Sequence, residues 1–258
     1  MNQPLRLIQI SDTHLSADPA AVSWGLNNQA RLERVLDHAL RHTPRPDAVL
    51  LTGDLVHDES PAGYRRLTRM LATLPAPVLC LPGNHDDPAA MRRLLSKPPL
   101  RFGGSHRVGG WLVILLDSHV DGRDGGALAP SELAALERTL GHNPQRPTLV
   151  CLHHHPVPVG SAWLDRMGLS NAADLFHILD RHAQTRGIVC GHVHQAFESR
   201  RGDLRIMTTP ATTRQFRPRS TRFALDERPP GYRWLHLYAD GTLETGIERV
   251  VTSEDGSS

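Results

Sequence analysis

Short clusters of histidine, aspartate and asparagine recur along the chain, and each directly follows an apolar run. The 258 residues include 16 His, many for this length. In chain order the clusters read SDTHLS, TGDL, PGNHD, HHHP and GHVH. They contribute Asp12, His14, Asp54, Asn84, His85, Asp86, His153, His154, His155, His192 and His194. Mixed carboxylate, amide and imidazole ligands suit Mn, Fe, Co, Zn or Ni better than Ca or Mg. The motifs therefore predict a site for transition-metal ions.

The spacing inside the motifs predicts how many ions are bound. Residues two apart in an extended chain face the same way, so Asp12 with His14, and His192 with His194, are each expected to grip one ion. By the same alternation, the two histidines after His153 cannot both point where it points. The whole set is too large for one tetrahedral ion. It suits two ions that share a bridging carboxylate, typically ~3.5–4 Å apart.

The first half of the chain alternates strand and helix signals. Apolar runs at 5–10, 47–51 and 77–81 predict strands, and helical spacing marks 27–42 and 62–74. This βαβαβ order favours a mostly parallel sheet with helices packed against it. Ligands collect outside the carboxyl ends of such strands, so the polar clusters are expected to meet there. Glycines beside the motif residues allow the tight turns that this requires.

The second half contains more strand signals than helix signals. The expected strands span 111–117, 148–152, 187–190, 204–208, 233–238 and 243–249, and the expected helices span 131–140 and 172–182. The late strands are expected to form a second sheet packed on the first. Without repeats or Gly/Ser-rich linkers, one domain is expected over 1–251, followed by a flexible tail at 252–258.

Charge, cysteine content and hydropathy indicate which partners and which cellular compartment to expect. The net charge of +2 does not favour nucleic acid as a partner. Three cysteines, Cys80, Cys151 and Cys190, each lie in an apolar run, which predicts buried, reduced thiols rather than a disulfide framework. No apolar run approaches the ~18 residues that span a bilayer, and no targeting segment is visible. A cytoplasmic protein without a membrane partner is expected.

The ordered motifs also carry a family resemblance. DTH, GD, GNHD, HHHP and GHVH, in this order, resemble the calcineurin-like metallophosphoesterases. HHHPVPVGSAWLD, GHVHQ, TTPATTRQF and PGYRWLHLYADGTL resemble the bacterial class III cyclic nucleotide phosphodiesterases, those acting on cyclic AMP in particular. This second resemblance extends over nearly the whole chain. It implies an α/β fold: a four-layer α/β/β/α sandwich with two mixed sheets flanked by helices and a dinuclear site at its top.

The resemblance also implies residue roles. The first metal would be held by Asp12, His14, Asp54 and His194, and the second by Asp54, Asn84, His153 and His192, with Asp54 as the bridge. His85 and Asp54 are the implied catalytic residues, and the implied substrate-binding set is His14, Asp54, Asn84, His85 and His194. The cofactors would be two divalent ions, Fe²⁺ and/or Mn²⁺. The implied reaction is hydrolysis of 3′,5′-cyclic AMP to 5′-AMP by a hydroxide that bridges the metals.

Several alternatives stay open at this point. The same site suits another phosphodiester, such as a glycerophosphodiester or a nucleic acid. An arginine-rich stretch at 200–233 leaves a nucleic acid substrate open. A non-catalytic scaffold on this fold should lack ligands, and none is missing. Asp86 either orients His85 or caps the turn. Trp163 and Phe216, in two long loops, either pack on a base or anchor those loops, and Arg217 either meets phosphate or is solvated. Metal identity, homodimer formation and the roles of His154, His155 and the loop 214–231 are not determined by the sequence.

Overall fold

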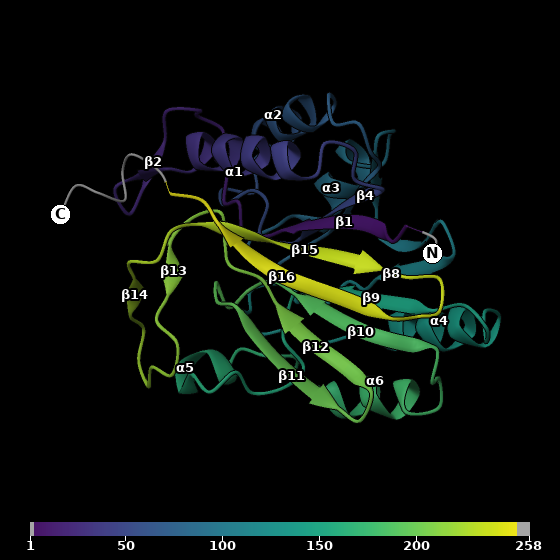
Figure 1. Cartoon of the computed structure of the whole chain (residues 1–258). Helices are drawn as coiled ribbons and strands as arrows, with labels where there is room; N and C mark the ends of the chain where they lie inside the picture. The colour runs from purple at the N-terminus through teal and green to yellow at the C-terminus, as the bar shows by residue number, and fades with distance from the viewer. Residues whose placement is uncertain (1–2, 252–258) are drawn as a thin grey trace.

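Two six-stranded β-sheets pack face to face, with helices on the outer surface of each (Figure 1). The computed structural model describes residues 3–251, so the tail expected at 252–258 lies outside the described residues. Within 3–251, no helix is both long and apolar enough to cross a membrane.

The first sheet has a parallel half and an antiparallel half. Its strands in spatial order are β16 (Leu243–Arg249), β15 (Gly231–Leu237), β1 (Leu5–Ile10), β4 (Ala48–Thr52), β5 (Val78–Leu81) and β6 (Leu100–Phe102). β1, β4, β5 and β6 run parallel, as the βαβαβ pattern predicts. β15 pairs antiparallel with β1. The strands expected at 233–238 and 243–249 therefore extend the first sheet, and their assignment to the second sheet was wrong. Alternation of apolar residues predicts a strand but not which free sheet edge it joins.

The second sheet is also mixed. Its strands in spatial order are β11 (Phe197–Arg201), β12 (Leu204–Thr208), β10 (Thr185–Cys190), β9 (Thr148–Leu152), β8 (Trp111–Leu115) and β7 (Gly104–Val108). The four inner strands run parallel, and β7 and β11 are antiparallel edges. Two short hairpins stand apart from both sheets: β2 (Val22–Ser23) with β3 (Leu26–Asn27), and β13 (Gln215–Phe216) with β14 (Leu225–Asp226).

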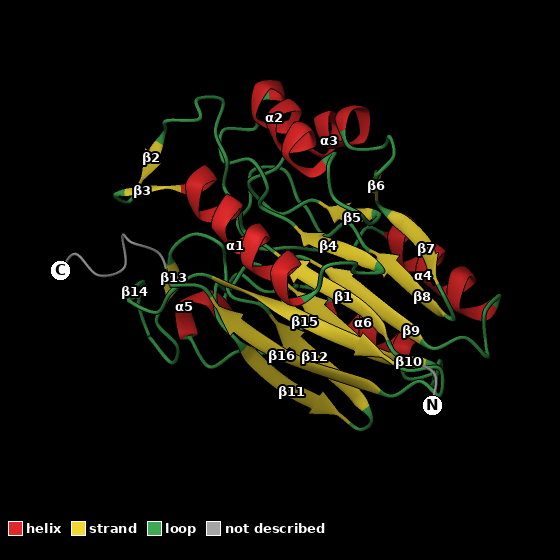
Figure 2. Ribbon diagram, turned by 45° about the horizontal axis from the view of Figure 1, so that its top comes forward, coloured by secondary structure: helices red, strands yellow, loops and turns green. Residues whose placement is uncertain are grey.

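The helices form the two outer layers (Figure 2). α1 (Asn28–His42), α2 (Pro61–Leu71) and α3 (Pro88–Leu94) cover the first sheet, while α4 (Pro130–Gly141) and α6 (Ala172–Leu179) cover the second; α5 (Ala162–Asp165) lies in a loop. Side chains cap the first three helices: the Asn27 carbonyl accepts from the Ala30 N–H, the Ser60 hydroxyl from Gly63, and the Asp87 carboxylate from Ala89 and Ala90. α3 was not predicted, because it is short and directly follows a site motif.

Apolar side chains fill all three interfaces between the four layers. On β1, Leu7 faces the other sheet, whereas its neighbour Ile8 faces the helices, as strand alternation requires. On β8, Val113 and Ile114 divide in the same way. These layers confirm the expected α/β/β/α sandwich. Cys80, Cys151 and Cys190 are buried and free, also as predicted.

An ion pair between a buried arginine and a half-exposed glutamate joins the two sheets. The Arg233 side chain of β15 is fully buried, and its Nη1 lies 2.8 Å from Oε1 of Glu198 on β11. Its Nη2 donates to the Thr208 carbonyl oxygen at 2.8 Å. A buried guanidinium is costly unless its donors are paired, so these contacts explain how a charge is tolerated between the sheets.

Candidate metal centre

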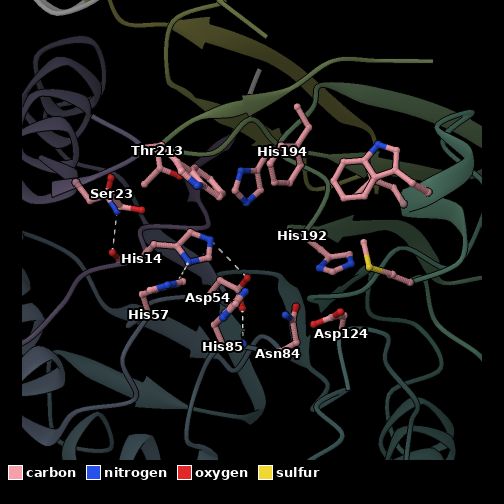
Figure 3. A pocket seen from close by; sticks show the side chains of 16 residues that line it. His14, Ser23, Asp54, His57, Asn84, His85, Asp124, His192, His194 and Thr213 are labelled. Carbon is pink, nitrogen blue, oxygen red and sulfur yellow. Dashed lines mark hydrogen bonds and ion pairs between the residues drawn. The ribbon is translucent and has the colours of Figure 1, made fainter. Parts of the chain in front are cut away.

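All five motif loops meet at the carboxyl ends of the parallel strands. Asp12 and His14 follow β1, Asp54 follows β4, and His192 and His194 follow β10. Asn84 and His85 follow β5, and His153 follows β9. The prediction that these side chains gather at one place is therefore confirmed. Figure 3 shows six of the eight around one cavity, and the ligand atoms of the other two, Asp12 and His153, lie within 4.8 Å of that of Asp54.

The reason given for the two period-two pairs was wrong. Their residues are not extended: Asp12, His14, His192 and His194 have φ of 56°, 41°, 68° and 49°. Asp54 is also left-handed, with φ of 53°. Non-glycine residues visit this region rarely and at a cost, and such outliers concentrate at functional sites. Sharp turns rather than a pleated strand aim these side chains into the site.

Two glycines make the close approach of the loops possible. Gly53 has φ of 93°, and a Cβ there would come within 2.7 Å of the Gly83 nitrogen. A Cβ on Gly83 would overlap the Asp54 carboxylate. Side chains at either position would push the TGDL and PGNHD loops apart.

Asp54 lies at the centre of the cluster. Its Oδ2 is 3.6 Å from Nε2 of His14, and its Oδ1 is 3.4 Å from Nε2 of His153. The backbone N–H of His85 donates to Oδ1 at 2.9 Å. One carboxylate thus has imidazole nitrogens on two sides and is fixed by the neighbouring loop.

The other candidate ligands surround Asp54 in two groups. Oδ1 of Asp12 is 3.3 Å from Nε2 of His194, and Oδ1 of Asn84 is 3.2 Å from Nε2 of His153. Ligand atoms of Asp12, His14 and His194 lie within 4.8 Å of one another, as do those of Asp12, Asp54 and His153. Nε2 of His14 and of His192 are buried without a hydrogen-bond partner. Buried polar atoms are normally paired, so this donor set fits divalent cations.

Hydrogen bonds on the far side of the rings orient the histidines. Nδ1 of His153 lies 2.7 Å from the Thr52 carbonyl oxygen, and Nδ1 of His194 lies 2.7 Å from that of Arg214. A carbonyl oxygen can only accept, so each Nδ1 carries a proton and each Nε2 faces the cluster. His14 differs, because its Nδ1 faces Nδ1 of His57 at 3.4 Å. His57 was missed from the sequence, since it lies outside the recurring motif residues.

The pKa values reflect how densely the charges are packed. Burial alone would raise the pKa of Asp54, but attraction to His153 and His14 holds it well below its usual range. Burial opposes a proton on His153, yet Asp54 raises its pKa to about 9. Burial lowers the pKa of His14 to about 3, and it also lowers the pKa of His192. A metal ion needs deprotonated ligands, so binding is expected to displace the His153 proton.

Asp86 acts as a cap and does not orient the His85 ring. Its carboxylate accepts hydrogen bonds from the backbone N–H groups of Leu55, Val56 and Gly83 and from the hydroxyl of Tyr64. These bonds tie the TGDL loop to the PGNHD loop. Of the two open interpretations of Asp86, the structure supports the turn cap.

His154 and His155 lie beside the candidate ligand His192, and the His154 ring is hydrogen-bonded to neighbouring loops. Nδ1 of His154 is 2.8 Å from the Ser118 hydroxyl, and its Nε2 is 3.2 Å from the Asp124 carbonyl oxygen. The buried ring of His155 lies parallel to that of His192, with centroids 5.8 Å apart. They support the loops around the site, in line with the expected alternation after His153.

A cavity of about 270 Å³ opens over the cluster. Its floor is formed by candidate ligands, and one wall is aromatic, with Trp24, Trp163 and Phe216. The Phe216 ring lies parallel to the His194 ring at a centroid distance of 4.1 Å. Trp163 and Phe216 thus line the site, whereas Arg217 does not. Trp24 was not predicted, because nothing in its neighbouring sequence distinguishes it from a surface loop residue.

Fold and site together define a class of protein. The chain belongs to the calcineurin-like phosphoesterase family, whose sequence model matches residues 5–196. It is 43% identical over 244 residues to the 3′,5′-cyclic adenosine monophosphate phosphodiesterase CpdA of Pseudomonas aeruginosa, covering 95% of this chain and 89% of that protein. It is 40% identical over 255 residues to the Haemophilus influenzae protein of the same name, covering 97% and 92%. A dimetal phosphatase from Danio rerio shares the fold, with a TM-score of 0.66 at 13% identity, covering 97% of this chain and all of that one.

Proposed function

We propose that this chain hydrolyses 3′,5′-cyclic AMP to 5′-AMP at a dinuclear metal centre. The observation that carries the proposal is the position of the Asp54 carboxylate. It lies between His14 and His153, below a cavity lined by aromatic residues and candidate metal ligands. The relatives at about 40% identity over nearly the full chain are named as enzymes of this reaction.

The ligand assignment follows from the grouping of donors. Asp12, His14 and His194 form one group beside Asp54, and His153 contacts both Asp54 and Asn84. His192 has a buried, unpartnered Nε2 and completes the second set. Asp54 reaches both sets and is proposed as the bridge. Fe²⁺ and Mn²⁺ are proposed as the ions, because both accept mixed oxygen and imidazole ligands.

The reaction breaks the bond between phosphorus and the ribose 3′ oxygen, and water supplies the new oxygen on phosphorus. When bound, two divalent ions supply neutralisation of the phosphate charge and activation of water. His14, Asp54, Asn84, His85 and His194 line the cavity floor, where the phosphodiester is proposed to bind. The His85 ring stands beside His14, with centroids 5.1 Å apart. We assign His85 the donation of a proton to the departing 3′ oxygen.

The lining of the cavity favours a small nucleotide over a nucleic acid. Among residues 3–251, no lysine or arginine lines it. A groove for a nucleic acid strand normally carries cationic side chains along the backbone path. In the arginine-rich stretch 200–233, Arg233 and Arg205 instead donate hydrogen bonds to Glu198, and Arg214 donates to the backbone carbonyl oxygen of Trp24.

A substrate panel tests the proposal. Purified protein with Mn²⁺ is offered cyclic AMP, cyclic GMP, a glycerophosphodiester and single-stranded DNA, and the products are identified by ³¹P NMR. Cyclic AMP hydrolysis is expected, with 5′-AMP as its only product. Formation of 3′-AMP, or turnover of the glycerophosphodiester or DNA without cyclic AMP hydrolysis, would contradict it.

A further inference from the structure

The wall of the cavity is an aromatic cluster drawn from segments far apart in sequence. Trp24 comes from the β2–β3 hairpin, Trp163 from α5, and Phe216 and Phe223 from the loop around β13. Phe216 lies 6.3 Å from Trp24, 5.1 Å from Trp163 and 5.5 Å from Phe223, between ring centroids. We call these four residues the aromatic wall; Trp24, Trp163 and Phe216 line the cavity, and Phe223 packs against all three.

Trp24 is the unusual member of this wall. It is 51% exposed, although it is a large apolar residue, and its φ of 49° is left-handed. A bulky side chain with positive φ is a genuine outlier that the surrounding structure must hold in place. The fold therefore maintains, at a cost, an aromatic ring at the mouth of the cavity without burying it.

Arg214 holds Trp24 in this position. Its Nη2 and Nε lie 3.0 Å and 3.3 Å from the Trp24 carbonyl oxygen. The backbone carbonyl oxygen of Arg214 itself accepts the hydrogen bond from Nδ1 of His194 at 2.7 Å. One residue thus connects a candidate metal ligand to the backbone of Trp24, which fixes the wall relative to the floor.

The wall offers mainly flat apolar surface, although the buried Nε1 of Trp163 is a donor without a hydrogen-bond partner. Asn28 and Thr213 also line the cavity, but the Asn28 amide donates to the His14 carbonyl oxygen at 2.9 Å and the Thr213 hydroxyl to that of Asp12 at 3.2 Å. Figure 3 shows Ser23 beside His14 and Asp124 across the cavity beside Asn84. A planar group of the ligand that lies against the wall is therefore held more by stacking than by hydrogen bonds to its polar edge.

We propose that Trp24 is the base-binding residue of this enzyme and stacks on the purine of the cyclic nucleotide while the phosphodiester lies over the floor. This inference rests on the proposed function and deepens it. Every nucleobase has a π-face, and purines offer the larger one. The site should therefore prefer purine over pyrimidine cyclic nucleotides and should discriminate only weakly between adenine and guanine.

Steady-state kinetics of Trp24→Ala test the proposal. The KM for cyclic AMP should rise roughly five- to 150-fold, the range for removal of one base-stacking aromatic, with kcat nearly constant. The preference for cyclic AMP over cyclic CMP should shrink, and Trp24→Phe should restore most of it. Val22→Ser removes a 65% exposed apolar side chain of the same hairpin outside this cavity and serves as the matched control. An unchanged KM in Trp24→Ala, or a loss confined to kcat, would overturn the proposal.

A double-mutant cycle tests the link to Arg214. Arg214→Met should raise the KM of the parent enzyme several-fold but change little once Trp24 is alanine, because both act through the same ring. Additive effects would refute the holding role of Arg214. If the parent does not hydrolyse cyclic AMP, the proposed function fails by itself. Calorimetric binding of 5′-AMP to the Mn²⁺-loaded parent and Trp24→Ala proteins then tests base stacking separately: weaker binding to the variant supports it, and equal binding refutes it.

Discussion

The floor and the aromatic wall of one cavity are built in opposite ways. The candidate ligands in and around the floor follow five strands, and Asp12, Asp54 and His153 are 0%, 3% and 0% exposed. The wall residues come from loops, and Trp24 and Phe223 are 51% and 54% exposed. Rigid strand ends thus position the groups that need the most exact geometry, whereas the part that selects the substrate is carried by segments able to vary without disturbing the sheets.

The largest effect should come from damage to the centre of the floor. Asp54→Asn removes the charge between His14 and His153, so occupancy of both metal sites should fall and activity should drop on the order of 10⁴-fold or more. Elemental analysis of the variant measures this. Asp37→Asn, an exposed carboxylate on α1, is the control. Two metals retained per chain in Asp54→Asn would rule out an essential bridge.

His85→Ala separates proton donation from the rest of the floor. The ribose 3′ alkoxide is strongly basic and needs a proton, so cyclic AMP hydrolysis should fall roughly 10²- to 10⁴-fold. A nitrophenolate leaving group needs little help, so bis-nitrophenyl phosphate hydrolysis should fall much less, with metal content unchanged. Equal losses on both substrates would assign His85 to charge stabilisation instead.

His57→Phe tests whether a residue that contacts a candidate ligand, without being one itself, contributes to metal affinity. Nδ1 of His57 is the partner of Nδ1 of His14, and loss of such a partner typically weakens metal binding 10- to 100-fold. Titration of the metal-depleted variant with Mn²⁺ measures the change in affinity. His57→Asn, whose Oδ1 replaces the lost acceptor, should bind close to the parent. Identical affinity of the Phe variant and the parent would exclude this role.

Glu198→Gln should lower the stability of the fold without changing the floor or the wall of the cavity. It weakens the partner of the buried Arg233, so the free energy of unfolding should fall about 1–2 kcal/mol, a modest value because Glu198 is 45% exposed. Burial raises the pKa of Glu198, but Arg233 and Arg205 lower it below its ordinary 4.5. The stabilisation is thus present above pH 4.5 and is lost as pH falls through the lower folded-state value.

Urea denaturation at neutral and acidic pH measures this difference, with exposed Glu227→Gln as the control. The gap between parent and Glu198→Gln should narrow in acid. An equal gap at both pH values would mean that the pair is not its source.

The floor was predictable from the sequence and the wall largely was not, for a physical reason. Parallel strands end at one edge, so motifs after apolar runs had to meet, and Asp12, Asp54 and His153 do. The left-handed turns at His14 and His192 were not foreseen, because backbone conformation leaves no periodic signal. Trp24 is held at the cavity by contacts with residues far along the chain, such as Arg214, 190 positions away, and local pattern cannot predict such a pairing. The edge joined by β15 was missed for the same reason.

Titration of metal-depleted protein with Mn²⁺, with bound metal and cyclic AMP hydrolysis measured on the same samples, tests the central claim most directly. The two halves of the floor around Asp54 predict that binding saturates at about two ions per chain and that 5′-AMP formation reaches its maximum only with the second. Saturation and full activity at one ion per chain, or full activity with metal shown to be absent, would contradict the dinuclear site.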